Sequence, residues 1–213
     1  MKGISTRAVL FDVDGVLVHG YHTRAEKRRR WDEHLLIDLG IDPDIFTKEF
    51  IRGIFEAQVL VGKMSLVNAL EQTLPKLGYS GSPMTVISYW LERDSQMNHQ
   101  LLDLIRNLQR TGAAKLCIAT NQEHLRAFHL WNDLGLRTIF DDMLNSARLG
   151  AMKPNRHFFE RASELLGNQA EPPLMFDDSP AVVAAANDFG WEGVLYDQIK
   201  DCSDHPWIRQ HLG

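Results

Sequence analysis

The stretch VLFDVDGVL, residues 9–17, decides the fold of this chain. It continues a short apolar run, residues 8–11, that has the length and composition of a buried strand. The run ends in Asp12 and Asp14, which are separated by one residue and followed by a glycine. Alternate side chains of an extended segment share a face, so the two carboxylates converge if the backbone stays extended. Because like charges held together need a cation or a shared proton, this pair at a strand end indicates a metal or catalytic site.

Composition places the chain among ordinary globular proteins. Its 213 residues, 44% hydrophobic and 24% charged, are enough for one large domain or a core with a smaller insert. The net charge of −5 argues against a nucleic-acid-binding surface. Two cysteines, Cys117 and Cys202, do not make a disulfide framework, so we expect a reducing, cytoplasmic setting. The apolar run before Asp12 is too short for a signal peptide or a membrane span, and we expect no membrane partner.

Residues 18–95 have the periodicity of helices and no convincing strand pattern, which predicts an all-helical insert. Caps and stop signals divide it into four helices: from Thr23 to Gly40, from Asp42 to Gly62, from Ser65 to Gly78, and from Ser82 to Asp94. Phe46, Phe50 and Ile54 share one face of the second helix, which indicates the core of the insert.

From Asn98 onward, short apolar strands alternate with helices. The expected strands are residues 115–119, 143–145, 174–176 and 193–196, and the helices are residues 98–112, 122–134, 155–166 and 180–189. This alternation is typical of βαβ units around a parallel sheet. We therefore expect an α/β fold, with a Rossmann-like core of residues 1–17 and 96–213 and a helical cap domain of residues 18–95.

Polar side chains also follow the later strands. They are Thr120 and Asn121 after the second strand, Lys153 beyond the third, and Asp177 and Asp178 after the fourth. All lie at the carboxyl side of the sheet, where ligands bind in this architecture. Together with Asp12 and Asp14, they supply four carboxylates, one hydroxyl and one ammonium, a set that suits a phosphoryl group with a magnesium ion.

Four motifs now make a family resemblance plain. They are DVDGV at residues 12–16, TN at 120–121, KP at 153–154 and DDSP at 177–180. In this order they resemble the motifs of the haloacid dehalogenase-like (HAD) hydrolase superfamily, in the group whose helical cap is inserted after the first strand. The resemblance covers the chain from Phe11 to about Tyr196 and implies the HAD fold.

The resemblance implies a phosphatase that forms an aspartyl-phosphate. Asp12 would attack phosphorus, and Asp14 would protonate the leaving oxygen and then activate water. The groups expected to hold the phosphoryl oxygens are Thr120, Lys153 and the backbone N–H groups of Val13 and Asn121.

Magnesium is the implied cofactor. Its expected ligands are Asp12, the backbone carbonyl of Asp14, and Asp178, with Asp177 either as a further ligand or as a support behind Asp178. Two alternatives stay open: Thr120 as the N-cap of the following helix, and Lys153 as an exposed lysine before a helix.

Further residues in the cap have two interpretations each. The basic run of Arg24, Lys27 and residues 28–30 is a solvated face of the first cap helix or attracts an anionic substrate. His19, Tyr21 and His22 contact a leaving group or serve only as a linker. Lys63, beside Gly62 at a helix break, is a candidate substrate-binding residue.

Three other functions compete with a phosphatase. A haloacid dehalogenase is disfavoured because family members that remove halide lack the second aspartate, which is Asp14 here. A phosphomutase would share every residue named above, and a non-catalytic phosphate-binding module would keep them without turnover. We expect a small phosphorylated metabolite as partner, no nucleic acid, and a monomer or homodimer.

Overall fold

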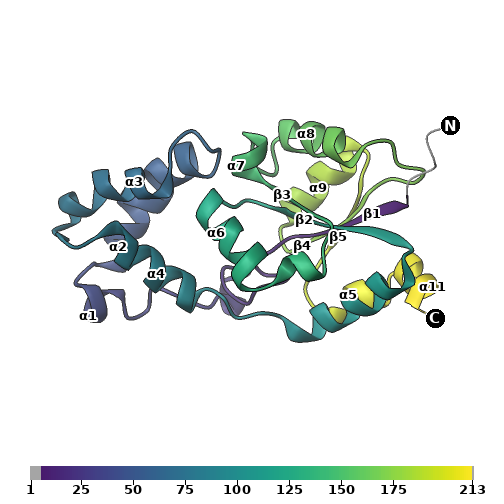
Figure 1. The fold of residues 1–213 in the computed structure, drawn as a ribbon, viewed down its shortest axis with the longest axis horizontal. Coiled ribbons are helices and arrows are strands. Elements are labelled where there is room, and N and C mark those ends of the chain that lie inside the picture. The colour runs from purple at the N-terminus through teal and green to yellow at the C-terminus, as the bar shows by residue number, and fades with distance from the viewer. Residues whose placement is uncertain (1–5, 213) are drawn as a thin grey trace.

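A computed structural model describes residues 6–212 and shows a five-stranded parallel sheet beside a group of helices (Figure 1). The strands are β1 (Arg7–Phe11), β2 (Ala114–Thr120), β3 (Asp142–Asn145), β4 (Leu174–Asp177) and β5 (Glu192–Leu195). All four neighbouring pairs are parallel, which confirms the expected α/β core. Residues 1–5 lie outside the described range. They include the start of the expected core domain and part of the stretch in which we expect no signal peptide.

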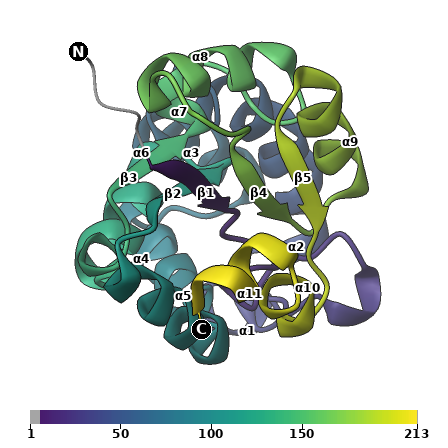
Figure 2. The same cartoon turned by 90° about the vertical axis from the view of Figure 1, so that its right-hand side faces the viewer.

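Helices cover both faces of the sheet (Figure 2). One face holds α5 (His99–Thr111), α6 (His124–Phe128), α10 (Ile199–Ser203) and α11 (Pro206–Leu212); the other holds α7 (Ser146–Leu149), α8 (Arg156–Leu166) and α9 (Pro180–Phe189). The side chains of β1 alternate between these layers: Val9 and Phe11 pack with α5, and Leu10 packs with α8. Both faces are covered, so the central strand is buried throughout its length, and its residues after Arg7 are all apolar. Within residues 6–212, no helix combines the length and apolar character needed to cross a bilayer.

The strand order places the motifs together. The order is β3-β2-β1-β4-β5, so the chain runs outward from β1 to β3 and then returns to the other side of β1. Ligands bind at such a reversal, at the carboxyl ends of the strands. The Asp12 N–H donates to the Phe176 carbonyl at 3.0 Å, which extends the pairing of β1 with β4 up to the first aspartate. Asp12 and the end of β4 are therefore neighbours.

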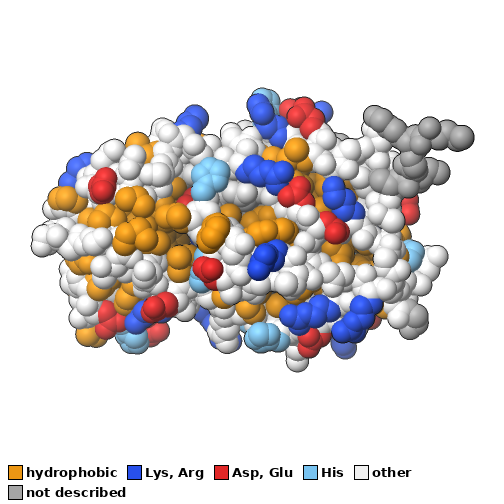
Figure 3. All heavy atoms as spheres, viewed as in Figure 1, with side chains coloured by type: hydrophobic (Ala, Val, Ile, Leu, Met, Phe, Trp, Pro, Cys, Tyr) orange, Lys and Arg blue, Asp and Glu red, His pale blue; other side chains and the backbone are white. Residues whose placement is uncertain are grey.

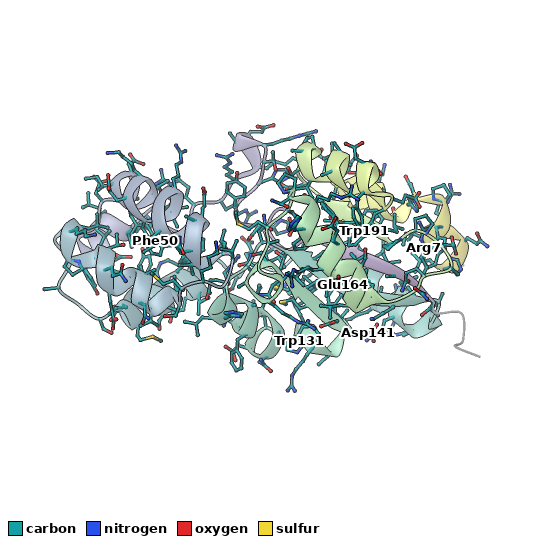
Figure 4. All side chains as sticks on the ribbon, turned by 90° about the horizontal axis from the view of Figure 1, so that it is seen from above. Arg7, Phe50, Trp131, Asp141, Glu164 and Trp191 are labelled. Atoms are coloured by element: carbon teal, nitrogen blue, oxygen red, sulfur yellow. The ribbon has the colours of Figure 1, made fainter. Side chains whose placement is uncertain are left out.

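The helices between residues 35 and 93 form a cap with an apolar core of its own. They are α1 (Leu35–Leu39), α2 (Pro43–Phe46), α3 (Leu66–Thr73) and α4 (Pro83–Arg93). Figure 4 shows Phe50 among these helices, far from Trp191 in the sheet layers. The predicted stripe is confirmed as core: Phe46 and Phe50 are fully buried, and Ile54 packs against the same cluster. On the face seen in Figure 3, apolar atoms gather over the cap and most Lys and Arg side chains lie over the sheet half.

The first predicted cap helix is wrong over most of its length. Between Thr23 and Gly40, the structure has a 3₁₀ turn at Ala25–Lys27 and only the short α1. Arg28 leaves the turn with extended backbone (φ −66°, ψ 135°), and its guanidinium donates to the His22 carbonyl at 2.6 Å. The basic side chains therefore stabilise an irregular segment. Trp31 still packs on the cap core, where its ring stacks on that of Trp90 with the ring centroids 4.8 Å apart.

The other helix signals of the cap hold. The side chains of Asp42, Ser65 and Ser82 each accept a backbone N–H at the start of a cap helix, as expected, and Asn98 does the same for α5 in the sheet domain. Beyond Asp42, α2 continues as a π-helical segment, Thr47–Val59, with a kink at Gly53 (φ −98°, ψ −109°). Glycine lacks a side chain to oppose such a conformation, so the single predicted helix is bent there.

The predicted helix 122–134 is also split. It consists of α6 followed by a π-helical segment, His129–Asp133. The N-cap of α6 is Glu123, whose carboxylate accepts the N–H groups of Leu125 and Arg126. The start of the helix thus lies three residues beyond Thr120, and the alternative that Thr120 caps it is wrong.

Candidate active site

Asp12 lies directly beyond β1 and is almost buried. Its Oδ1 accepts the Val13 N–H at 2.7 Å and lies 2.9 Å from the Lys153 ammonium. Among the described residues, no group donates to its Oδ2. One carboxylate oxygen is therefore fixed by the protein, and the other remains available to a ligand. The Val13 N–H, expected to bind a phosphoryl oxygen, is directed to Asp12 in this structure.

Lys153 is buried, so the alternative of an exposed lysine is wrong. Its ammonium contacts the Ala119 carbonyl at 2.7 Å and Asp177 Oδ2 at 2.6 Å, in addition to Asp12. Asn121 fixes the backbone of Lys153: its amide donates to the Lys153 carbonyl at 2.9 Å and accepts the Lys153 N–H at 2.8 Å. The TN and KP motifs thus form one unit, in which the Lys153–Pro154 peptide is cis.

Asp177 and Asp178 differ in how their oxygens are used. Both oxygens of Asp177 accept hydrogen bonds, one from Lys153 and one from the Ser179 N–H at 2.9 Å. Asp178 accepts only at Oδ2, from the Thr23 N–H at 2.6 Å, with His22 Nδ1 at 3.2 Å. Within residues 6–212, no donor is directed to Oδ1 of Asp178. This pattern favours Asp178 as a direct metal ligand, with Asp177 holding Lys153.

Gly15 lets the first loop approach Asp178. A Cβ built on Gly15 would lie 2.7 Å from Asp178 Oδ2, and its φ of +77° is in the region that favours glycine. The glycine of the DVDGV motif therefore has a steric role beside the carboxylates.

Three carboxylates converge here. One oxygen each from Asp12, Asp177 and Asp178 lies within 4.8 Å of the others. Burial raises the pKa of Asp12 to about 7; the nearby Lys153 opposes this shift, and the Asp177 and Asp14 carboxylates add to it. Burial also raises the pKa of Asp178. Three buried acids face one ammonium, so a divalent cation with a preference for oxygen ligands fits this set.

Thr120 contributes a hydroxyl without a partner. The residue ends β2 and is buried, and its Oγ1 has no hydrogen-bond partner among the described residues. Leaving a buried hydroxyl unpaired costs free energy. A phosphoryl oxygen at this site would supply the missing acceptor.

Asp14 is held by two side chains that the sequence analysis did not single out. Gln122 Nε2 donates to Asp14 Oδ2 at 2.6 Å. The Arg126 guanidinium donates to both carboxylate oxygens, at 2.9 and 2.8 Å. Both residues follow the TN motif closely, but Gln122 precedes the N-cap Glu123 and Arg126 lies in α6, so no helical spacing in the sequence indicates that they converge on Asp14.

The remaining candidates lie around this cluster. His22 is buried against Asp178, whereas His19 and Tyr21 are exposed. Arg24 and Lys27 pair with Asp197, so part of the basic run ties the start of the cap to the sheet domain. Lys63 is exposed on the cap loop that reaches the core: a Cβ on its neighbour Gly62 would overlap the Ala147 carbonyl.

A cavity of about 720 Å³ adjoins the cluster on the Asp178 side. Gly15, His22 and the two chain segments that join the cap to the core contribute to its lining. Asp12, Asp14 and Lys153 do not line it, so this cavity is separate from the space above the paired aspartates.

A sheet of this order, with an acidic cluster and a buried lysine at its carboxyl edge and a helical cap after β1, defines a HAD-type hydrolase. The model of the haloacid dehalogenase-like hydrolase family matches residues 6–190. The chain therefore belongs to that family. A search of curated proteins found no match.

Solved structures share the fold. A HAD family enzyme of Bacteroides thetaiotaomicron, in a magnesium complex, is 20% identical with a TM-score of 0.72, over 92% of this chain and 94% of that one. A predicted HAD-like hydrolase of Porphyromonas gingivalis is 23% identical with a TM-score of 0.72, over 96% and 95%. The putative hydrolase YfnB of Bacillus subtilis, bound to magnesium, is 21% identical with a TM-score of 0.54, over 87% and 84%.

Proposed function

We propose that this chain is a magnesium-dependent phosphatase that hydrolyses a small phosphorylated metabolite through an aspartyl-phosphate. The observation that carries the proposal is the convergence of the Asp12, Asp177 and Asp178 carboxylates, two of which, Asp12 and Asp177, pair with the buried Lys153. This excess of buried negative charge suits a divalent cation together with a phosphoryl group. The structurally similar Bacteroides enzyme is described in complex with magnesium and inorganic phosphate.

In the proposed reaction, the available Oδ2 of Asp12 attacks phosphorus and the ester oxygen leaves. Asp14 delivers a proton to that oxygen and then takes one from the water that hydrolyses the aspartyl-phosphate. The Thr120 hydroxyl and Lys153 bind the non-transferred oxygens, with the Asn121 backbone beside them. Asp12, Asp178 and the Asp14 carbonyl would hold the magnesium ion, which neutralises phosphoryl charge when bound. Asp177 supports Lys153 from behind.

Phosphate release provides the test. A panel of sugar and nucleotide monophosphates is incubated with the protein, with and without Mg²⁺, and inorganic phosphate is measured. We expect Mg²⁺-dependent release from at least one ester and its loss in Asp12→Asn. Full Mg²⁺-dependent activity of Asp12→Asn would refute the assignment of the nucleophile.

A dehalogenase is the second candidate, because a structure described as an L-2-haloacid dehalogenase also shares the fold, at 16% identity and a TM-score of 0.58. Halide leaves carbon without a proton, so a dehalogenase does not need the acid that Asp14 supplies. Chloride release from 2-chloropropionate separates the two reactions. Efficient release without metal would contradict the phosphatase.

A phosphomutase would return the phosphoryl group to a second hydroxyl of the same sugar. Product analysis with a hexose 1-phosphate decides this point: free phosphate indicates hydrolysis, and hexose 6-phosphate indicates a mutase. Failure to turn over any ester while retaining phosphate binding would instead indicate a non-catalytic module.

We place the enzyme in the cytoplasm, as a monomer or homodimer. Cys117 and Cys202 are both unpaired and buried, which suits a reducing compartment. Lys63 stays a candidate for contact with the substrate, because its loop reaches from the cap to the core beside Ala147.

A further inference from the structure

Arg126 connects the proposed acid–base residue to the cap. Its guanidinium makes two bonds to the Asp14 carboxylate and lies 3.0 Å from Asp94 Oδ2, and it also donates to the Asp94 carbonyl at 3.2 Å. The side chain is only 6% exposed. Although burial opposes the charge, the Asp14 and Asp94 carboxylates raise the pKa of Arg126, so it is a cation shared between two acids.

Asp94 is bonded to the cap as well as to Arg126. It ends α4, its N–H donates to the Trp90 carbonyl at 2.9 Å, and Trp90 Nε1 donates to Asp94 Oδ2 at 3.0 Å. Trp90 in turn stacks on Trp31 in the cap core. A rigid movement of the cap therefore carries Asp94 with it.

Both segments that join the cap to the core cross at this point. Residues 94–98 lead back from α4 to α5, and Gly20 lies on the outward segment. A Cβ on Gly20 would overlap Asp94 Oδ1 and would lie 3.9 Å from Asp14 Oδ1. Asp94 Oδ1 is buried and has no hydrogen-bond partner among the described residues, so one acceptor next to Arg126 is unused.

We propose that Arg126 is a positioning residue that ties the orientation of the Asp14 carboxyl group to the position of the cap through Asp94. The inference rests on the proposed phosphatase function. The rigid fork of the guanidinium fixes the plane of the carboxylate that it binds on two oxygens. When Asp94 moves with the cap, Arg126 shifts between its two acidic partners, and the unused oxygen of Asp94 offers it a further acceptor. Asp14 is thereby aligned with the leaving oxygen only for one arrangement of the cap.

The test compares two esters that differ in their need for an acid. The leaving group of p-nitrophenyl phosphate departs without a proton, whereas the alkoxide of glucose 6-phosphate, or of the best alkyl ester in the panel, requires one. The parameter is kcat/KM, which includes the steps up to transfer of the phosphoryl group to Asp12. For Arg126→Met we expect kcat/KM to fall about 10²-fold with the alkyl ester and to stay near the wild-type value with the aryl ester.

Asp94→Asn keeps the volume and leaves Arg126 on Asp14. We expect a smaller but still selective loss with the alkyl ester, and no further loss when Asp94→Asn is added to Arg126→Met, because Asp94 acts through Arg126. Arg126→Lys, which restores the charge without the fork, should recover only part of the activity. Arg106→Met is the matched control: its guanidinium pairs with Asp103 on the exposed face of α5, and no selective change is expected.

Equal losses with both esters, or additive effects of the two substitutions, would overturn the inference while the phosphatase assignment stands. A wild-type protein that releases no phosphate in the presence of Mg²⁺ would overturn the proposed function and the inference together. If Arg126→Met does not fold, Asp94→Asn decides alone, and absence of a selective loss with the alkyl ester contradicts the inference.

Discussion

The ionisation of Asp12 should be coupled to magnesium binding. Its pKa is raised to about 7 by burial and by the neighbouring carboxylates, so in the metal-free chain the group holds a proton below that pH. Under the proposed function, Mg²⁺ would bind the Asp12 carboxylate and compete with the proton. The apparent affinity for Mg²⁺ should therefore fall about tenfold per pH unit below pH 7 and level off above it, as measured by calorimetry between pH 6 and 8.

Asp12→Asn is the control for this pH dependence. The variant should bind Mg²⁺ more weakly than the wild type and should lose the contribution that Asp12 makes to the pH profile. Equal Mg²⁺ affinity of the wild type at pH 6 and pH 8 would contradict the coupling.

A substitution of Thr120 should change activity without loss of stability. Its hydroxyl is buried and has no partner in the described part of the chain, so Thr120→Val should keep or slightly raise the free energy of unfolding, by up to about 1 kcal/mol. The same change removes the proposed donor to the phosphoryl group and should lower kcat/KM on the order of 10²-fold. Chemical unfolding and steady-state kinetics measure the two effects.

Thr73→Val is the control for Thr120→Val and should affect stability rather than activity. The Thr73 hydroxyl is buried in the cap and donates to the Ala69 carbonyl at 2.9 Å. We expect it to lose about 1 kcal/mol of stability and to retain its activity. A Thr120→Val protein that is destabilised yet fully active would show that Thr120 is structural.

Single residues were predictable where chemistry is carried by a local motif. The DVDGV motif pointed to Asp12 and Asp14, and the TN motif to Thr120, because each motif follows an apolar run. Arg126 has no such signal. It is one charged residue on a short helix, and its partner Asp14 lies 112 positions earlier in the chain. Only the folded chain brings the two together.

A substitution in the cap loop at residues 60–64 tests whether the cap must approach the core. Gly62 has a φ of +70°, and a Cβ there would overlap the Ala147 carbonyl. Gly62→Ala should therefore push the loop away from the core and raise the KM for the preferred ester. The expected cost of the backbone strain is about 1 kcal/mol. Kinetics and thermal unfolding report the two consequences.

Gly78→Ala is a matched control within the cap. Gly78 has a φ of +79°, and a Cβ there would meet nothing within 4 Å. Gly78→Ala should therefore lose as much stability as Gly62→Ala without a change in KM. Equal KM values for the two variants would mean that contact of the loop with the core has no part in substrate binding.

The starts of three cap helices were predictable, but the first cap helix was not. Asp42, Ser65 and Ser82 mark starts because their side chains accept the first N–H groups, a local interaction that the sequence records. The segment from Thr23 to Gly40 has helical spacing of Trp31 and Leu35, but it contains a basic run whose side chains bind the His22 carbonyl and Asp197. These contacts override the periodicity.

For the whole molecule, magnesium should act as a stabilising ligand. Three buried acids lie close together, and the one ammonium among them pairs with Asp12 and Asp177, so their mutual repulsion opposes folding in the absence of metal. At 100 times its Kd, Mg²⁺ should add about 2.7 kcal/mol to the free energy of unfolding, which corresponds to a rise in Tm of about 5–10 °C. A thermal scan with and without chelator measures the shift. Asp178→Asn should abolish most of it, and an undiminished shift in that variant would show that the ion binds elsewhere.

The sheet as a whole followed from the alternation of strands and helices, but its order did not. Parallel strands with helical crossovers predict which end of the sheet holds the motifs. The placement of β4 beside β1, which brings Asp177 to Lys153, depends on packing between distant segments.

The most direct test of the account is transfer of the phosphoryl group to Asp12. A ³²P-labelled aryl ester that the wild type hydrolyses, such as p-nitrophenyl phosphate, is used because its leaving group departs without a proton. It is mixed with Asp14→Asn and Mg²⁺ and quenched with acid within milliseconds to seconds. Because the variant lacks the proposed base that activates water, we expect a labelled, hydroxylamine-sensitive acyl phosphate on the peptide that contains Asp12, and no label when Asp12→Asn is added. Steady hydrolysis with no labelled protein, or label that persists without Asp12, would contradict the account.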